Sequence, residues 1–569
     1  MGVKSATFQS GGLLSQHRLP GAYSRLDFIK GTGGLVSAAN AVIMGDSRGG
    51  EPNKLLWFTG PADAENVLRD GDLLDAIRHA FRPGGGLTPQ AIAAWRVNAG
   101  TRAVREFTEA GAGNQIDVTA WDYGLHTNQL KIKLETTATK LTVQFQNNTA
   151  EITEGIGKDS LSITCTDGTV TTATVTISKT SLITTIVDGS AVSLSCLFSA
   201  FPTIEDLVNY INDQEHYTCL LTTLVKTDPS SELDSLSATD IKGVVVVATS
   251  DLQAIIDVLN DSPWIDTAAF DTASSIRILP DDDTGWVYLS GAVDGTYDAT
   301  AWGVSLTLLE QEDIQLIGTS DDVAATHALI ATHCAAMCAV AGKAERQFIV
   351  GGAAGEAVSA AVTRAENLTS EYGMLAYPGF KHYDFDDITS IITYKPSYYA
   401  AKLIGANVAL SLNEPATFKD VDVLEWEKVL TIPEAEQLIK AGVCPGIKHK
   451  TGRLLTGRTV TTYQGTDLQR CEFSMMREAL FVSRDLRTAV EESFIGRAMS
   501  NNLLGKVDAV AYGKLSQYND MGLFTGDPPY WGYKKTINGD QIEIEYDCYL
   551  TPPTNFIFIT SHMHVYASA

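Results

Sequence analysis

The sequence is poor in basic residues, and that shortage excludes two classes of partner. Its 569 residues include 42 Lys and Arg against 68 Asp and Glu, which gives a formal net charge of −26. Binding to nucleic acid needs clustered Lys and Arg that contact phosphates, so we expect no direct contact with nucleic acid. The same charge balance disfavours anionic membrane surfaces, so we expect no direct membrane contact either.

Cysteine, targeting signals and long apolar runs are also scarce. Eight cysteines in a chain of this length do not make a disulfide scaffold. The segment Met1–Ala6 has no apolar stretch of the signal-peptide kind, and Ala6 departs from the myristoylation pattern. Apolar runs such as Gly243–Ala248 are too short to span a bilayer. We therefore expect a cytosolic product with reduced thiols.

What the chain does contain is an ordinary globular composition, with 44% hydrophobic and 19% charged residues. At about 150 residues per domain, this length predicts about three or four domains. Short apolar runs at Ala39–Met44 and Ala91–Val97 predict buried strands, and helical periodicity lies between them. The predicted fold class is α/β (α+β) and multidomain, with an inner α/β domain that carries terminal β-strand arms.

A change of composition marks a β-rich insertion. Thr, Ser, Ile and Val alternate through Leu130–Leu134, Leu141–Gln146, Leu161–Cys165 and Val170–Ile177, which predicts half-buried antiparallel strands. Asp167-Gly168 predicts a two-residue hairpin between the last two. We therefore expect an outer α/β domain interrupted by this insertion.

The second half returns to alternating strands and helices. Strands are expected at Gly243–Ala248 and Ser275–Leu279, with a helix at Leu252–Leu259 between them, which favours parallel βαβ units. Near the C-terminus we expect one long helix over Thr488–Lys514 and a terminal strand over Asn555–Tyr566.

These observations divide the chain into six segments. They are an N-terminal linking arm (1–22), the first part of the outer α/β domain (23–111), the β-rich inserted domain (112–230), the second part of the outer domain (231–384), an inner domain (385–550) and a C-terminal linking arm (551–569).

One motif raises the question of catalysis. Gly45-Asp46-Ser47-Arg48-Gly49 follows a predicted strand and fits the G-x-S-x-G nucleophile elbow. The residues after it, Gly50-Glu51-Pro52, do not readily continue as the helix that an elbow requires. A plain turn is the favoured interpretation, and a serine hydrolase that uses Ser47 remains a remote alternative.

The other candidate sites are weaker still. His327, Cys334 and Cys338 share one face of a predicted helix, as zinc ligands could, but small apolar neighbours favour core packing. No pair of carboxylates stands out as an acid and a base. We therefore predict no catalytic, cofactor-binding or metal-binding residues and no cofactor.

The charge distribution is more informative. The window from Lys440 to Lys506 holds 11 basic and 6 acidic residues, a net charge of +5 in a chain of −26. A basic face on an acidic body suits docking to an acidic partner. The alternative is that these bases pair with acidic residues of the same chain.

Several short motifs, in their order along the chain, resemble the sheath proteins of contractile phage tails. Leu19-Pro20-Gly21-Ala22-Tyr23 is similar to the family's Pro-Gly-Val-Tyr motif. Phe58–Ala64 and Trp95–Ala103 are similar to its N-terminal α/β pattern, and Leu289–Gly295 is similar to its Leu-x-Gly-Gly-x-Asp-Gly turn, with Ala292 in place of the second Gly. Ala435–Val443, Arg458–Thr462 and Phe494–Arg497 resemble its C-terminal signature. The insertion at 112–225 lies outside the resemblance.

The resemblance implies a structural protein, not an enzyme. In that family, stacked hexameric rings polymerise helically around a tail tube and contract, which drives the tube through the host envelope during genome delivery. The implied partners are further copies of this chain, the tail tube protein, and the baseplate and tail terminator proteins. The implied location is the virion tail, with assembly in the host cytoplasm.

Two sets of residues follow from the resemblance. The terminal arms would add strands to sheets in neighbouring subunits, through Phe8, Leu13, Leu14, Phe556, Phe558, His562, His564 and Tyr566. The basic window would face the tube, through Arg484, Arg487, Arg497 and Lys506. A strand as apolar as the C-terminal one would be an aggregation hazard if it stayed unpaired, which supports the arm interpretation.

Two other hypotheses stay open besides the hydrolase. The sheath of a phage-like bacteriocin or another contractile injection particle is physically the same polymer. A monomeric surface-binding protein built on the β-rich insertion is a third class, and sedimentation of the purified chain separates it from a sheath.

Overall fold

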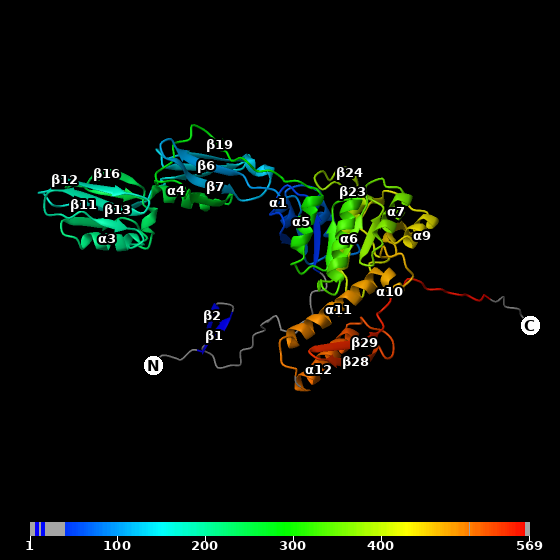
Figure 1. Ribbon diagram of the computed structural model, residues 1–569. Helices are drawn as coiled ribbons and strands as arrows, with labels where there is room; N and C mark the ends of the chain where they lie inside the picture. The colour runs from blue at the N-terminus through cyan, green and yellow to red at the C-terminus, as the bar shows by residue number, and fades with distance from the viewer. Residues whose placement is uncertain (1–5, 11–12, 18–39, 500, 564–569) are drawn as a thin grey trace, which may run out of the picture.

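The computed structural model describes residues 6–10, 13–17, 40–499 and 501–563. Figure 1 shows an elongated molecule in which two β-rich units lie in a row beside a larger α/β body, with a smaller C-terminal unit on another side of that body. This mixed α/β architecture confirms the predicted fold class. Among the described residues, no helix combines the length and the apolarity that crossing a lipid bilayer requires.

The body is built on an eight-stranded sheet of order β27-β26-β22-β21-β20-β3-β5-β4, antiparallel only at its two edge strands. The strands are β3 (Ala41–Gly45), β4 (Leu55–Phe58), β5 (Ile92–Arg96), β20 (Leu316–Thr319), β21 (Gln347–Gly351), β22 (Gly373–Tyr377), β26 (Val443–Lys448) and β27 (Leu454–Thr456). The predicted strands near residues 41 and 92 are confirmed. One sheet therefore joins three distant stretches of sequence, and the expected boundary at 384/385 runs through it.

Helices cover both faces of this sheet, which explains why β3 and β5 are buried at every position. The helices of the body are α1 (Pro61–Leu68), α2 (Asp72–Ala80), α5 (Ala299–Leu309), α6 (Ala324–Cys338), α7 (Val358–Leu368), α8 (Pro396–Ala409) and α9 (Ile432–Lys440). Ala41 and Ile43 pack into the core that α2 and α8 share, whereas Val42 and Met44 pack into the core of α5 and α6. Because successive side chains of a strand point to opposite faces of the sheet, alternate residues of β3 pack into two separate cores.

A small three-stranded sheet lies on the body. Its order is β24-β23-β25, with β23 at Phe380–Tyr383, β24 at Ile391–Tyr394 and β25 at Glu425–Trp426. Phe380 and Trp426 face the core of α2 and α8, so this sheet closes one side of that core. Its outer strand, β24, is exposed over its first three residues.

Residues 104–290 form two β-rich units, one nested within the other. The proximal unit contains β6 (Val104–Glu109), β7 (Gly113–Ala120), β8 (Leu130–Glu135), β9 (Lys140–Phe145), β10 (Glu151–Glu154), β18 (Ile265–Phe270), β19 (Val287–Tyr288), α4 (Asp251–Asn260) and the short 3-10 helix Leu125–Gln129. These elements surround one core of their own. The distal unit interrupts it between β10 and α4.

The distal unit is a second, independent core. It contains β11 (Asp159–Cys165), β12 (Thr172–Ile177), β13 (Ser181–Val187), β14 (Ser195–Leu197), α3 (Ile204–Asn212), the 3-10 helix Ser230–Glu232, β15 (Tyr217–Leu221), β16 (Leu236–Asp240) and β17 (Val246–Thr249). Its two sheets have the orders β15-β11-β17 and β14-β13-β12-β16.

The pairings in these units correct several expectations. The stretch at 243–248 does not form a parallel strand, because β17 pairs antiparallel with β11. The expected boundary at 230/231 therefore falls inside the distal unit. No strand forms at 275–279, and the strand that follows α4 is instead β18. Asp167-Gly168 does not close a hairpin, because β11 and β12 lie in different sheets.

The C-terminal unit comprises α10 (Leu468–Cys471), α11 (Phe473–Phe494), α12 (Asn501–Asp520), β28 (Tyr530–Asn538) and β29 (Gln541–Cys548). The expected single helix over 488–514 is wrong. Ile495 leaves helical geometry with ψ of 137°, and Gly496 follows with φ of +80°, so the chain turns and α12 packs back on α11.

The two ends of the chain differ in form. In the N-terminal segment, β1 (Ala6–Ser10) pairs antiparallel with β2 (Leu13–His17). At the other end, residues 551–563 form no strand, so the described part of the terminal strand expected over Asn555–Tyr566 is not paired within this chain.

Candidate assembly surfaces

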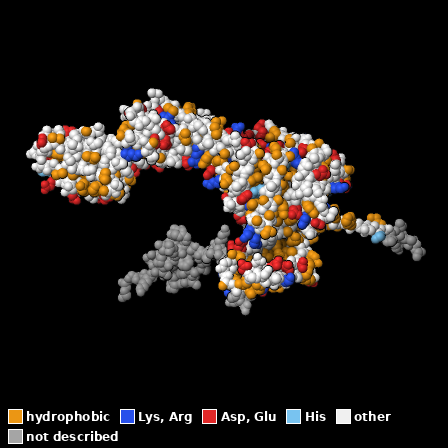
Figure 2. Space-filling model, in the orientation of Figure 1, with side chains coloured by type: hydrophobic (Ala, Val, Ile, Leu, Met, Phe, Trp, Pro, Cys, Tyr) orange, Lys and Arg blue, Asp and Glu red, His pale blue; other side chains and the backbone are white. Residues whose placement is uncertain are grey.

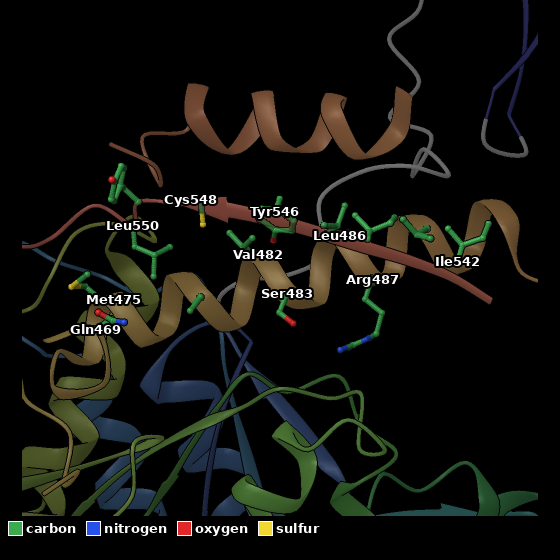
Figure 3. Close-up of a pocket in the computed structure, with 14 residues that line it drawn as sticks. Gln469, Met475, Val482, Ser483, Leu486, Arg487, Ile542, Tyr546, Cys548 and Leu550 are labelled. Carbon is green, nitrogen blue, oxygen red and sulfur yellow. The ribbon is translucent and has the colours of Figure 1, made fainter. Parts of the chain in front are cut away.

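An apolar groove with a volume of about 820 Å³ lies between α11 and β29. Figure 3 shows β29 crossing above α11 with the lining side chains between the two elements. The helix contributes Met475, Ala479, Val482, Ser483, Leu486, Arg487 and Val490, and the strand contributes Ile542, Ile544, Tyr546 and Cys548. Figure 2 shows hydrophobic side chains gathered in this region, between the body and the hairpin.

The strand beside this groove has an unfinished edge. β28 and β29 form a two-stranded sheet, so within the described residues β29 has a hydrogen-bonding partner on one side only. Its even-numbered residues from Ile542 to Cys548 face the groove and are half-buried, whereas Gln541, Glu543 and Glu545 are exposed. An isolated two-stranded sheet is marginally stable, and a further strand would both pair with β29 and fill the groove.

The C-terminal segment offers a continuous run of exposed apolar residues, 556–559. Phe558 and Ile559 are 92% and 85% exposed, and Phe556 and Ile557 are also exposed. Figure 1 shows this segment leaving the body and extending away from it. So large an apolar exposure in a short extended segment is typical of a strand that pairs with another chain.

The base of this segment is anchored to the body. Asn555 Nδ2 donates a hydrogen bond of 2.9 Å to the buried Glu472 carboxylate, which also accepts from Arg458 Nε at 2.6 Å. The Arg458 guanidinium lies 5.6 Å from the centre of the Phe556 ring. Burial raises the pKa of Glu472, and Arg458 opposes that shift. The direction in which the segment leaves the body is therefore set by residues of the body.

The remaining arm residues can be placed only in part. Phe8 lies in β1, and Leu13 and Leu14 lie in β2, so both stretches do adopt strand backbone. His562 is exposed on the C-terminal segment. His564 and Tyr566 lie outside the described residues.

The four basic residues expected to face a tube separate into two pairs. Arg484 is buried and donates to the backbone carbonyl of Glu345 at 3.5 Å. Arg487 forms a bidentate ion pair with the Glu345 carboxylate, with one N–O distance of 2.7 Å. Both therefore join α11 to the body, as the pairing alternative proposed. Arg497 and Lys506 are exposed and stay available for a partner.

Ser47 does not have the environment of a nucleophile. Its side chain is buried, and its Oγ donates to the carbonyl of Gly49 at 2.7 Å. Its backbone N–H donates to Asn98 Oδ1 at 3.1 Å. The motif is a tight turn after β3, and the chain continues without a helix to residue 60.

The histidines and cysteines of α6 have other roles. His327 contacts the backbone carbonyl of Asp321 at 3.1 Å, and His333 accepts from Arg346 Nη1 at 3.0 Å. Burial lowers the pKa of each imidazole to about 4. Cys334 is buried in the core. Across the described residues, no group of three or more His, Cys, Asp or Glu side chains is arranged to hold a metal ion.

One important cluster escaped the sequence analysis. Arg96 is fully buried, and its guanidinium donates to the carbonyls of Gly50, Tyr123 and Asp294 at 2.9–3.1 Å. It thus links the body to the proximal unit, through Tyr123, and to the segment that returns from that unit, through Asp294. Both partners lie in motifs of the sequence, Trp95–Ala103 and Leu289–Gly295, but no feature of the sequence indicates that these two motifs are in contact.

Comparison with known proteins adds an independent line of support. No family model matches the chain. The tail sheath protein of Bacillus phage SP01 is 26% identical over 570 residues, which covers 95% of each chain. A putative tail sheath protein of Enterococcus phage phiEF24C is 25% identical and is matched over 82% of this chain and 83% of its own length.

Among solved structures, the sheath tail protein from Desulfitobacterium hafniense aligns with a TM-score of 0.51 at 13% identity, over 93% of this chain and 99% of its own. That likeness shows a shared fold. Together with the phage relatives, which match over 82–95% of the chain, it confirms the resemblance that the motifs indicate. The chain is similar to phage tail sheath proteins along most of its length and shares the fold of a solved sheath tail protein.

Proposed function

We propose that this chain is the structural subunit of a contractile tail sheath, which polymerises helically around a tail tube and contracts to drive it through the host envelope during genome delivery. The observation that carries the proposal is the unpaired edge of β29 above an apolar groove, in a chain whose C-terminal segment exposes a continuous run of four apolar residues, 556–559. Each copy has both a vacant strand position beside β29 and an exposed apolar segment that could occupy such a position in another copy.

We assign the vacant position beside β29 to the C-terminal segment of a neighbouring copy. Backbone hydrogen bonds along the strand would supply affinity, and side chains on one face would enter the groove over α11. Phe556 and Phe558 lie on one face of an extended segment, and Ile557 and Ile559 on the other. The N-terminal segment, which already contains strand backbone, would link a further neighbour.

Such a contact is heterologous, because the donating segment and the accepting groove are different surfaces. Heterologous contacts whose rotation does not close into a ring generate helical polymers. The internal joints, at Arg96 and at Glu345, favour motion of each subunit as a near-rigid body about its arms during contraction. A gain of about 1 kcal/mol per copy, the scale of ordinary coupling between sites, sums over many copies without nucleotide hydrolysis.

The tube-facing surface is assigned to Arg497 and Lys506. Both lie near the turn that joins α11 to α12, and both are exposed. Exposed cations suit long-range attraction to an acidic tube surface.

The remaining partners follow from the same assignment. The polymer is built of stacked hexameric rings that contact a tail tube protein, a baseplate and a tail terminator. Its location is the virion tail, with assembly in the host cytoplasm. The role is structural rather than enzymatic and needs no cofactor.

Electron microscopy of the expressed chain tests the proposal. The full chain should form hollow tubes, and a chain that ends at residue 555 should not, because its β29 edges stay vacant. Phe558→Asp with Ile559→Asp should have the same effect. Leu224→Asp with Val225→Asp is the matched control, because both residues are exposed apolar side chains in the distal unit. Tubes from the shortened chain, or a full chain that stays monomeric at high concentration, would contradict the proposal.

A further inference from the structure

The body exposes a second strand edge that the terminal arms do not explain. β24 pairs with β23 and has no other strand partner among the described residues. Ile391, the first residue of this strand, is 56% exposed, and Ile388, in the loop three residues before it, is 77% exposed. Soluble proteins normally protect a strand edge of this kind, so an apolar edge left open indicates a contact surface.

The loop that leads into β24 is acidic. Asp386 and Asp387 are exposed and precede Ile388 directly. Hydrogen bonds from Ser390 and Thr389 lower the pKa of Asp387, so it stays ionised. Asp386 has one ion-pair partner, Arg78 at 3.4 Å, and its side chain remains 77% exposed. This edge therefore presents apolar side chains together with negative charge.

A basic surface lies at the other edge of the same small sheet. β25 forms the other edge of that sheet and contacts β26, whose end carries Lys448 and Lys450 into the turn before β27. Both lysines are exposed, and within the described residues neither forms an ion pair. The half-exposed Phe418 packs against His449 in this turn, with ring centres 5.7 Å apart, and adds apolar surface.

We propose that the β24 edge and its acidic loop dock on the β26–β27 turn of a second copy of this chain. The two surfaces are complementary in charge, and each carries exposed apolar side chains. Docking of β24 on its own equivalent would oppose Asp386 and Asp387 to like charges, which disfavours a two-fold contact. The contact is instead head-to-tail, which is the type that a sheath polymer repeats. The inference rests on the proposed function and adds a body-to-body interface to it.

Charge reversal on each side provides the test. The first variant carries Lys448→Glu and Lys450→Glu, and the second carries Asp386→Lys and Ile388→Lys, which leaves the hydrogen bonds of Asp387 in place. Each alone should raise the critical concentration for tube formation by roughly fivefold at low salt, because like charges then meet at every contact. A mixture of the two should assemble near the wild-type concentration, because alternating copies bring opposite charges together again.

The control is Asp213→Lys with Glu215→Lys at exposed positions of the distal unit, which changes the net charge by four, as the first variant does, but with opposite sign. It should assemble as the wild type does. If the wild type forms tubes and the Lys448→Glu, Lys450→Glu variant forms them at the same concentration with the same salt dependence, this interface is refuted and the proposed function stands. If the wild type forms no tubes, the proposed function fails first. Circular dichroism checks that the Lys448→Glu, Lys450→Glu variant is folded. Its assembly then tests the interface even if the Asp386→Lys, Ile388→Lys variant misfolds.

Discussion

Arg96 donates a hydrogen bond of 3.1 Å to the backbone carbonyl of Asp294, a residue 198 positions further along the chain. Asn98 Nδ2 donates to the same carbonyl at 2.6 Å. These contacts join the point where the chain leaves the body to the point where it returns from the two β-rich units. A single buried guanidinium thereby holds three segments together, and its removal is the first prediction.

Arg96→Ala should lower the free energy of unfolding by about 3–5 kcal/mol, because several buried carbonyl oxygens lose their donors. Arg96→Lys should recover only part of this loss, since an ammonium group lacks the planar fork that reaches separate acceptors. Chemical denaturation of the full chain below its assembly concentration measures both. Arg48→Ala is the control, because the Arg48–Asp70 pair is exposed and should contribute less than about 1 kcal/mol.

The turn next to Asp294 needs glycine for two reasons. Gly295 has φ of +82°, and a Cβ there would lie 2.4 Å from the backbone of Ala99. Gly295→Ala should therefore destabilise the chain by about 2–4 kcal/mol. Gly291 is the matched control, with φ of +85° and open space around its Cβ position. Its Ala variant should lose only about 1 kcal/mol, the cost of backbone conformation alone. Equal losses in thermal unfolding would contradict the role of the Ala99 contact.

Glu478 on α11 should make stability depend on pH. It is fully buried, and burial raises its pKa to about 8, although Arg477 and the Thr551 backbone oppose the shift. Since the folded state holds this proton more tightly than the unfolded state, stability is lost as pH rises from about 4.5 to 8.

Glu478→Gln should accordingly be more stable than the wild type at pH 8, by at least about 1 kcal/mol, and should lose that advantage near pH 4. Asp75 and Asp234, whose pKa values are raised to about 6, act in the same direction. The difference between variant and wild type, measured by denaturation at each pH, isolates Glu478. A difference that does not change with pH would refute the assignment.

The joint between α11 and the body depends on Glu345. Glu345→Ala should cost about 2–4 kcal/mol, because Arg487 loses its carboxylate partner in a half-buried site. Lys343→Ala, which removes the exposed neighbouring pair with Glu491, should cost less than about 1 kcal/mol. Hydrogen exchange should show faster opening of α11 in the first variant only.

Tube binding should depend on Arg497 and Lys506 and not on the buried arginines. Reversal of both to Glu should weaken co-assembly with a tail tube severalfold at low salt and leave the formation of empty tubes unchanged. Co-sedimentation with purified tube across a salt series measures this. Unchanged binding at every salt concentration would remove these two residues from the tube-facing surface.

Local periodicity was sufficient for most individual elements. The apolar runs of β3 and β5, and the helical pattern of α4, depend on interactions between residues that lie close together in the sequence. The break at Gly496 was missed because the apolar spacing continues across it, and only the packing of α12 back on α11 requires the turn. The contacts of Arg484 and Arg487 with Glu345 cannot be predicted from local sequence, because Glu345 lies about 140 positions away.

Composition and motif order by themselves indicated the resemblance to tail sheath proteins and the mixed α/β class, because these depend on which residues are present and in what order. Only the tertiary structure decided which strands pair, where the groove forms, and which cations stay exposed. The physical reason is that β pairing and ion pairing join residues that are distant in sequence. The free energy of each pairing depends on how deeply it is buried, and the local sequence pattern does not determine that burial.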